Sequence, residues 1–362
     1  MSFASNYNYT DRILHYIAFS APFVQKILSE LESDLFKNHL NTVKSHHEVF
    51  VTGMPRSGTT LLLELLYGTG EFKTYTYRHM PFIQAPLLWD RVSRPFQKRG
   101  IKQERAHGDG MEISFDSPEA FEEIIWISAI GNKIVKQNTI STLSASDYSH
   151  ELAEVIRNSI KKVLLLSNEF SDSSQQQRYL SKNNANISRI GLISKIFPTS
   201  IIFVPFRHPL SHVSSIMKQH SRFLTEHEKN RFSKQYMKWL GHYEFGENFK
   251  PINFDSWLGN DFVSSNIDVN FWLKYWTVTY SNILKNKDKN IYLVDFDKLL
   301  RNGKSVLEKI ANYAELRDKT KFIDCASLLR SPTSHSITTE KCSPKILNTA
   351  ETIYAELKFV AI

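Results

Sequence analysis

The 362-residue chain is poor in cysteine, with only Cys325 and Cys342. Two isolated cysteines supply neither the paired spacing of a zinc site nor the framework of a disulfide-stabilised domain. We therefore expect no metal site and a reducing compartment, which we take to be the cytoplasm.

Long apolar runs are also missing, since no run approaches the roughly 18 residues that a membrane-spanning helix needs. Asp11, Arg12 and His15 interrupt the apolar N-terminal region, which is unlike a secretory signal. We therefore expect neither a signal peptide nor a transmembrane anchor. The 41% apolar content is ample for a large core, and neither repeats nor a low-complexity linker divides the chain, so residues 1–362 are predicted to form one domain.

Acidic residues are outnumbered by basic ones, which gives a formal net charge of +8. This excess suits an anionic ligand or an acidic partner, although the basic residues are spread along the chain rather than gathered in a tail, and we expect no nucleic-acid partner. One local run is rich in bases, and we interpret it first as a solvated face, leaving open contact with an acidic acceptor or a membrane surface. Its basic members are Arg91, Arg94, Lys98, Arg99, Lys102 and Arg105.

The segment 49–66 predicts a strand, a tight loop and a helix, because a short β-branched and aromatic run ends at Gly53 and an apolar helical run follows Gly58. Such a loop directs backbone N–H groups and a helix N-terminus at one point, which forms an anion site. The spacing matches a nucleotide phosphate loop, but Thr59 stands where the lysine of that motif belongs and Arg56 lies inside the loop. The missing lysine disfavours ATP or GTP hydrolysis and favours another phosphorylated donor.

The run Pro55-Arg56-Ser57-Gly58-Thr59-Thr60 resembles the 5′-phosphosulfate-binding loop of sulfotransferases, which use 3′-phosphoadenosine 5′-phosphosulfate (PAPS) as donor and release adenosine 3′,5′-bisphosphate (PAP). The resemblance implies that these six residues bind the donor.

Two later segments extend the resemblance. Lys182 ends a short predicted strand, at a position similar to the lysine with which sulfotransferases stabilise the leaving phosphate. Arg207 directly follows the buried run Ile201–Phe206, and Ser215 lies eight residues further, within a predicted helix that starts near Pro209. This pair resembles the arginine and serine that bind the 3′-phosphate of PAPS. Arg330 and the Ser/Thr cluster after it stand where cytosolic members have an Arg-Lys-Gly segment, and a substitute for that segment is left open.

The resemblance implies an α/β fold of three layers, similar to phosphate-loop proteins, with a central, mainly parallel sheet flanked by helices. Residues 1–45 are expected to form a helical extension, broken near Pro22. The aromatic-rich segment 219–270 is interpreted as an insertion on the acceptor side, with plain packing of a helical subregion as the alternative.

The residue that removes the acceptor proton is the least determined part of the site. Carbohydrate and tyrosyl sulfotransferases carry a glutamate a little over twenty residues past the basic residue of the loop, and in this chain that window contains His79. His79 is therefore the predicted base, with His107 and then Asp109 and Glu112 in reserve. Ser117 and Pro118 predict a helix start, which gives the following glutamates a role in the first helical turn.

The sequence thus predicts a PAPS-dependent sulfotransferase that acts on a hydroxyl or amine, with a glycan or glycolipid as the expected acceptor by analogy. The alternatives are a phosphate-loop nucleotide kinase or NTPase and a non-catalytic nucleotide-binding protein. The oligomeric state is left open.

Overall fold

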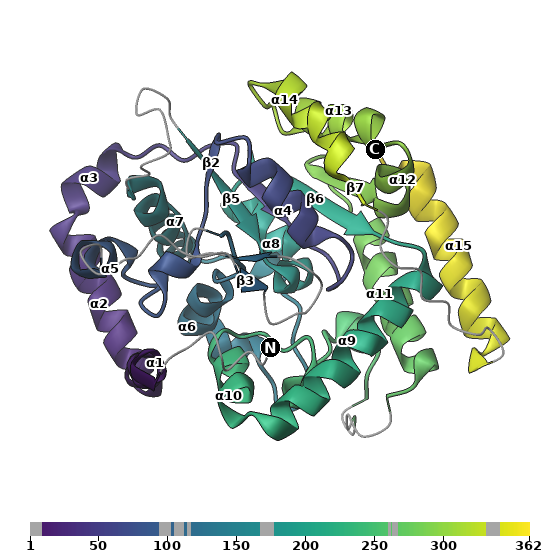
Figure 1. Ribbon diagram of the computed structural model, residues 1–362, viewed down its shortest axis with the longest axis horizontal. Helices are drawn as coiled ribbons and strands as arrows, with labels where there is room; N and C mark the ends of the chain where they lie inside the picture. Colours follow the sequence, from purple (N-terminus) through teal and green to yellow (C-terminus); the bar gives the residue numbers. More distant parts are fainter. Residues whose placement is uncertain are drawn as a thin grey trace.

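The computed structural model describes residues 9–93, 117–166, 177–259, 262, 267–330 and 341–362, and the backbone of 103–104 and 112–113. Its centre is a five-stranded sheet of order β2-β5-β1-β6-β7 in which every neighbouring pair is parallel (Figure 1). The strands are β1 (Val49–Val51), β2 (Phe72–Lys73), β5 (Arg178–Lys182), β6 (Ile201–Phe206) and β7 (Ile291–Asp295), and a separate antiparallel pair joins β3 (Gln103–Glu104) to β4 (Glu112–Ile113). The predicted α/β fold with a parallel sheet is confirmed.

Alternate residues of each central strand enter different apolar clusters. Phe50 and Ile202 belong to one cluster, whereas Val49, Val51 and Phe203 belong to the other. Successive side chains of a strand point to opposite faces, so the sheet separates two cores and the molecule has three layers. Both faces of β1 and β6 are buried, which explains why these strands read as continuous apolar runs.

The helices that form the outer layers surround the sheet on both sides (Figure 1). The α4 helix and the α12–α13 pair contribute to the smaller cluster, and α7, α8, α9 and α11 contribute to the larger one. The helices are α1 (Tyr9–Ser20), α2 (Pro22–Leu35), α3 (Lys37–Thr42), α4 (Thr59–Tyr67), α5 (Pro86–Ser93), α6 (Glu123–Ile134), α7 (His150–Leu165), α8 (Ile190–Ile196), α9 (Pro209–Lys229), α10 (Arg231–Trp239), α11 (Val269–Lys285), α12 (Phe296–Arg301), α13 (Gly303–Tyr313), α14 (Lys319–Asp324) and α15 (Pro344–Val360).

The helix predicted to start at Pro118 starts instead at Glu123, so this prediction is wrong. Pro118 forms an isolated antiparallel bridge with Thr76, the residue that precedes the 3₁₀ turn Tyr77–His79. The local preference of Ser117 and Pro118 for a helix start is therefore overridden by strand-like pairing with a distant segment. As a consequence, Glu119 lies outside the helix, and its carboxylate is available to the edge of the sheet.

Segment 219–270 contains the end of α9 and all of α10, followed by irregular backbone with short 3₁₀ turns, and some of its aromatic rings pack on α11. Phe249 lies 4.8 Å from Trp272 and Trp257 lies 5.7 Å from Tyr275, measured between ring centroids. The acceptor-side role of this segment stays a prediction. In the part of the chain that the structure describes, no helix combines the length and apolarity that a membrane crossing requires.

Candidate active site

The loop between β1 and α4 takes a backbone path that two residues with positive φ make possible. Arg56 has φ 72° and Gly58, which caps the N-terminus of α4, has φ 106°. A Cβ atom built on Gly58 would lie 2.2 Å from Cδ2 of Phe296, so glycine is required by both conformation and space. The loop directs the N-terminus of α4 at the carboxyl end of the sheet, where an anion is stabilised.

Three residues that the sequence predicted for donor binding come together beside this loop. Arg56 donates from Nε to Ser215 Oγ at 3.3 Å, and Arg207 donates from Nη1 to the carbonyl oxygen of Arg56 at 3.3 Å. Among the described residues, none gives the buried Nε of Arg207 a hydrogen-bond partner. Burial lowers the pKa of Arg207, and the neighbouring Arg56 cation lowers it further while Asp297 opposes them. Two close cations, of which Arg207 has an unpaired buried donor, are an arrangement that suits a phosphate.

His212, which the sequence analysis did not assign, contacts the backbone of the loop at Pro55. Trp276 donates from Nε1 to His212 Nδ1 at 3.1 Å, and His212 Nε2 lies 2.9 Å from the carbonyl oxygen of Pro55. Since Nδ1 accepts, Nε2 carries the proton and donates to Pro55. Burial, followed by the charge of Arg207, lowers the pKa of His212 to about 3, which keeps the ring neutral. A single histidine inside a helix gives no sequence signal for this role.

Lys182 ends β5 and faces a carboxylate at the same edge of the sheet. Its Nζ lies 3.8 Å from Glu119 Oε1, and both side chains are less than one-tenth exposed. Glu119 also accepts from Tyr77 OH at 2.9 Å and from the backbone N–H of Ala120 at 2.8 Å. The sequence analysis gave Glu119 a role in the first turn of a helix. It could not detect the Thr76–Pro118 bridge, which joins segments far apart in the chain and brings Glu119 to Lys182.

The residues after Lys182 connect β5 to the loop. Thr59 Oγ1 donates to Asn184 Oδ1 at 3.0 Å, and Thr52 Oγ1 donates to the carbonyl oxygen of Asn183 at 2.8 Å. Asn184 also reaches Glu244 Oε1 from its Nδ2 at 3.4 Å. The ends of β1 and β5 are therefore fixed relative to each other by side chains.

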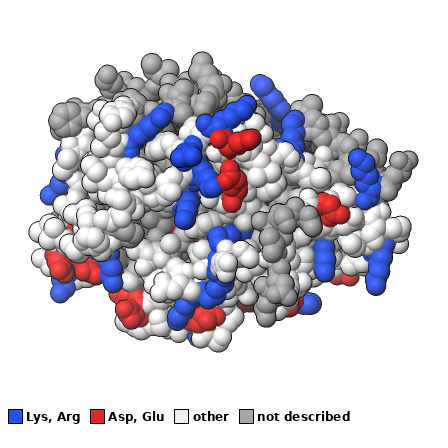
Figure 2. Space-filling model, turned by 90° about the horizontal axis from the view of Figure 1, so that it is seen from below, with Lys and Arg blue, Asp and Glu red and all other residues white. Residues whose placement is uncertain are grey.

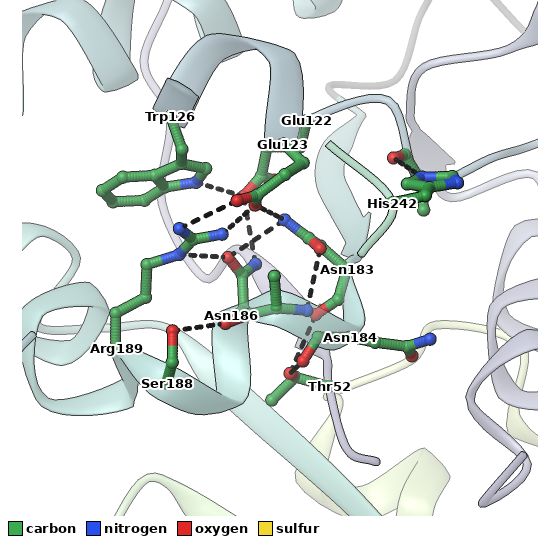
Figure 3. A network of polar contacts seen from close by, with 12 residues as sticks. Thr52, Glu122, Glu123, Trp126, Asn183, Asn184, Asn186, Ser188, Arg189 and His242 are labelled. Carbon is green, nitrogen blue, oxygen red and sulfur yellow. Dashed lines mark hydrogen bonds and ion pairs between the residues drawn. The ribbon is translucent and has the colours of Figure 1, made fainter. Parts of the chain in front are cut away.

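A buried polar network lies behind this connection (Figure 3). Glu123 accepts from Asn183 Nδ2 at 2.7 Å and forms an ion pair with Arg189, whose Nε donates to Asn186 Oδ1 at 2.9 Å. Glu122 accepts from Asn186, from Trp126 Nε1 and from Tyr179 OH. Each of these carboxylates accepts from buried partners on and beyond β5, so the network positions the end of this strand.

His79, the predicted base, is buried in the 3₁₀ turn next to Tyr77. Its Nδ1 accepts a hydrogen bond from the backbone N–H of Thr76 at 2.9 Å, and its ring lies edge-on to Tyr75. The neutral ring must then carry its proton on Nε2. Of the reserve residues, His107 and Asp109 lie outside the described residues, and Glu112 is described only by its backbone in β4.

A cavity of about 40 Å³ lies between the loop and the aromatic segment, which is room for one or two water molecules. Its walls join Met54 and Pro55 of the loop to Asn184, Glu244 and the rings of Tyr243, Phe249, Trp272 and Tyr275. Figure 2 shows Lys and Arg side chains over much of the face in view, with acidic side chains among them near the centre, in keeping with the modest excess of positive charge.

The chain was compared with protein families, curated proteins and solved structures. The model of the sulfotransferase family matches residues 48–254. A comparison with curated proteins finds no match. Similar solved structures include sulfotransferase STF1 from Mycobacterium tuberculosis, with 13% identity, a TM-score of 0.49 and coverage of 93% of this chain and 83% of that one. Sulfotransferase STF9 from Mycobacterium avium has 12% identity, a TM-score of 0.47 and coverage of 90% and 80%.

The matched region contains the loop, Lys182, Arg207 and Ser215 and spans more than half of the sequence. The chain belongs to the sulfotransferase family.

Proposed function

We propose that this protein transfers a sulfonate group from PAPS to a hydroxyl or amine of an acceptor. The observation that carries the proposal is the convergence of Arg56, Arg207 and Ser215 beside a phosphate-type loop without the nucleotide-hydrolase lysine. A nucleotide kinase or NTPase, the earlier alternative, needs that lysine and a magnesium site.

The residues present suit a donor with two separate phosphate groups. The loop Pro55–Thr60, with the N-terminus of α4, would hold the 5′-phosphosulfate, and Gly58 lets the backbone approach it closely. Arg207 and Ser215 would hold the 3′-phosphate, for which the unpaired Nε of Arg207 is a ready donor. Bound PAPS supplies a sulfonate group already joined to a phosphate leaving group.

Lys182 would stabilise the negative charge that develops on the leaving phosphate. It ends β5, which pairs with β1 directly before the loop, so its position favours the reacting centre over the adenosine. A cation that acts mainly as charge develops contributes to the transition state more than to binding.

Two residues compete for the role of base, His79 and Glu119. His79 uses its Nδ1 lone pair to accept from Thr76, so the neutral ring has no vacant position for a second proton. Glu119 is a carboxylate, whose oxygens have two lone pairs each and can take up a proton, and it sits 3.8 Å from Lys182, which suits a pair acting at the two ends of one transfer. In the proposed step, the acceptor oxygen bonds to sulfur, its proton passes to Glu119, and the sulfur–oxygen bond to the 5′-phosphate breaks with its electrons on the phosphate.

The two assignments separate in a comparison of Glu119→Gln and His79→Asn. We expect Glu119→Gln to lower kcat by about 10²–10⁴ with unchanged PAP affinity, since a lost base affects the chemical step. We expect His79→Asn to lower kcat by less than ten-fold. The reverse ranking would assign the base to His79, and full activity in both variants would direct attention to His107.

The function itself is tested by calorimetry with PAP in the presence of EDTA and by transfer of ³⁵S from labelled PAPS to a panel of glycans, glycolipids and phenols. Tight PAP binding without Mg²⁺ and weak ATP binding are expected. Mg²⁺-dependent ATP binding without PAP binding would support the kinase alternative, and PAP binding without transfer to any acceptor would support a non-catalytic protein. The glycan or glycolipid acceptor rests on family analogy alone.

A further inference from the structure

The α2 helix has an inverted distribution of polar and apolar side chains. Its exposed side presents a stripe at every fourth position, Phe23, Ile27, Leu31 and Leu35, and each of these side chains is 48–64% exposed. Residues four apart lie on one face of a helix, so the stripe is a continuous apolar ridge about 20 Å long. Figure 1 shows α2 on the outer edge of the molecule, across from α15.

The side of α2 that faces the protein is held by polar contacts. Glu32, fully buried, pairs with Lys162 of α7 at 3.5 Å and accepts from the backbone N–H of Leu88 at 2.7 Å. Gln25 donates to the carbonyl oxygen of Pro81 at 2.9 Å, and Lys162 donates to Ser29. A surface helix normally buries its apolar stripe and exposes its polar side. In α2 the buried side chains include the polar residues Gln25 and Glu32, whereas the apolar ridge is exposed. An exposed apolar ridge of this kind indicates a contact with another molecule.

The charges beside the ridge indicate its partner. Lys26, Glu30 and Asp34 form a parallel row next to the ridge, with the cation near the N-terminus of α2 and the two anions near its C-terminus. If a second α2 packs antiparallel about a two-fold axis between Ile27 and Leu31, each Lys26 faces the partner's anions. In a parallel pair the two-fold axis runs along the helices, so the two rows lie on opposite sides of the contact and cannot pair. An anionic membrane surface is disfavoured, because interfacial helices carry mainly Lys and Arg on the polar side.

We propose that the α2 ridge is a homodimer interface in which two copies of this chain pack their α2 helices antiparallel. Ridges at four-residue spacing interlock well when two helices cross, with Ile27 and Leu31 at the centre. The preceding α1 helix also exposes large apolar side chains, Tyr9, Ile13 and Ile17, which would add to the contact. The proposal does not depend on the proposed enzyme activity.

Sedimentation velocity and light scattering over a concentration series test the interface with the full chain. The wild type is expected to have twice the 42.0-kDa chain mass at micromolar concentration. Ile27→Glu, which places a charge at the centre of both copies, should raise the dimer dissociation constant by about 100-fold or more. Val155→Glu, at an exposed apolar position of α7, is the matched control and should leave the dimer intact.

A charge reversal tests the antiparallel order. Lys26→Glu alone should weaken the dimer by about ten-fold, and Lys26→Glu with Glu30→Lys and Asp34→Lys should restore it. A monomeric wild type, or a dimer that Ile27→Glu leaves unchanged, would overturn the proposal. So would co-sedimentation of a monomer with phosphatidylserine vesicles that Ile27→Glu abolishes, since the ridge would then bind a membrane.

Discussion

The ends of β5 and β6 each lead to an arginine that lies over an aromatic ring, but the two arginines differ in their partners. Arg189, beyond β5, is fully buried over Trp126 and is paired with Glu123 and Asn186. Arg207, directly after β6, is half-buried over Phe296 and makes one 3.3 Å bond to a carbonyl oxygen while it lies near the Arg56 cation. The first arginine is satisfied by the protein itself, whereas the second keeps donor capacity for something else.

This difference distinguishes a cation that the protein satisfies from one with an unpaired buried donor, without reference to sequence motifs. A buried donor without a partner costs about 1–3 kcal/mol, and that cost persists until a ligand accepts the bond. The Arg207 guanidinium therefore carries a free-energy cost that an anion would remove, and the Arg189 guanidinium does not. Substitutions at the two ends should accordingly affect different measurements.

The largest effect is expected from Arg189→Ala, which leaves Glu123 buried without its cation. The loss of stability should be about 3–5 kcal/mol, measured by urea denaturation, because an unpaired buried charge is strongly destabilising. Adding Glu123→Gln to this variant should recover part of the loss. An Arg189→Ala protein as stable as the wild type would remove the distinction between the two arginines.

Arg207→Ala should produce the opposite pattern. We expect PAP affinity, measured by calorimetry, to fall by about 2–4 kcal/mol, because a charge-assisted phosphate contact is lost. Stability should stay the same or rise slightly, since an incompletely paired donor is removed. Unchanged PAP affinity would place the 3′-phosphate elsewhere.

Lys182→Ala tests whether the β5 end contributes to chemistry as well as to structure. The expected result is a decrease in kcat of roughly 10² with PAP affinity nearly intact, since in the proposed role the lysine would act on charge that develops in the transition state. Glu119 keeps the hydrogen bonds of Tyr77 and Ala120 in this variant, so the fold should be retained. Parallel losses in affinity and kcat would contradict the assignment.

The smallest effect concerns pH and His212, which supports the loop on the β6 side. The folded-state pKa of about 3 lies below the ordinary value of 6.5, so this contribution to stability is complete above about pH 6.5 and decreases as the pH falls towards 3. The slope from one such group is at most about 1.4 kcal/mol per pH unit. His212→Gln should therefore show a shallower loss of stability than the wild type between pH 6.5 and 4.5 in urea denaturation. Equal slopes would show that His212 is protonated without cost in the fold.

The sequence predicted the parts of the site that lie close to strand ends. Arg207 follows an apolar run that is typical of a buried strand, and Lys182 ends a short predicted strand. Parallel strands end at one edge of the sheet, so the proximity of both residues to the loop could be anticipated. Glu119 could not be assigned in this way, because its place depends on the bridge between Thr76 and Pro118. Local capping preferences predicted a helix there, and a contact between distant segments prevailed. The roles of His212 and Arg189 likewise follow from tertiary packing, which no local pattern encodes.

The contact between Gly58 and Phe296 links three positions that are far apart in the chain. Any side chain at position 58 would collide with the ring of Phe296, and that same ring supports the Arg207 guanidinium at 5.4 Å. A smaller residue at position 296 would make room for a side chain at 58, but it would remove the surface on which Arg207 rests. A substitution at any one of positions 58, 207 and 296 is therefore tolerated only with compensating changes at the others. Among related sequences, we expect these three positions to change together or to stay the same.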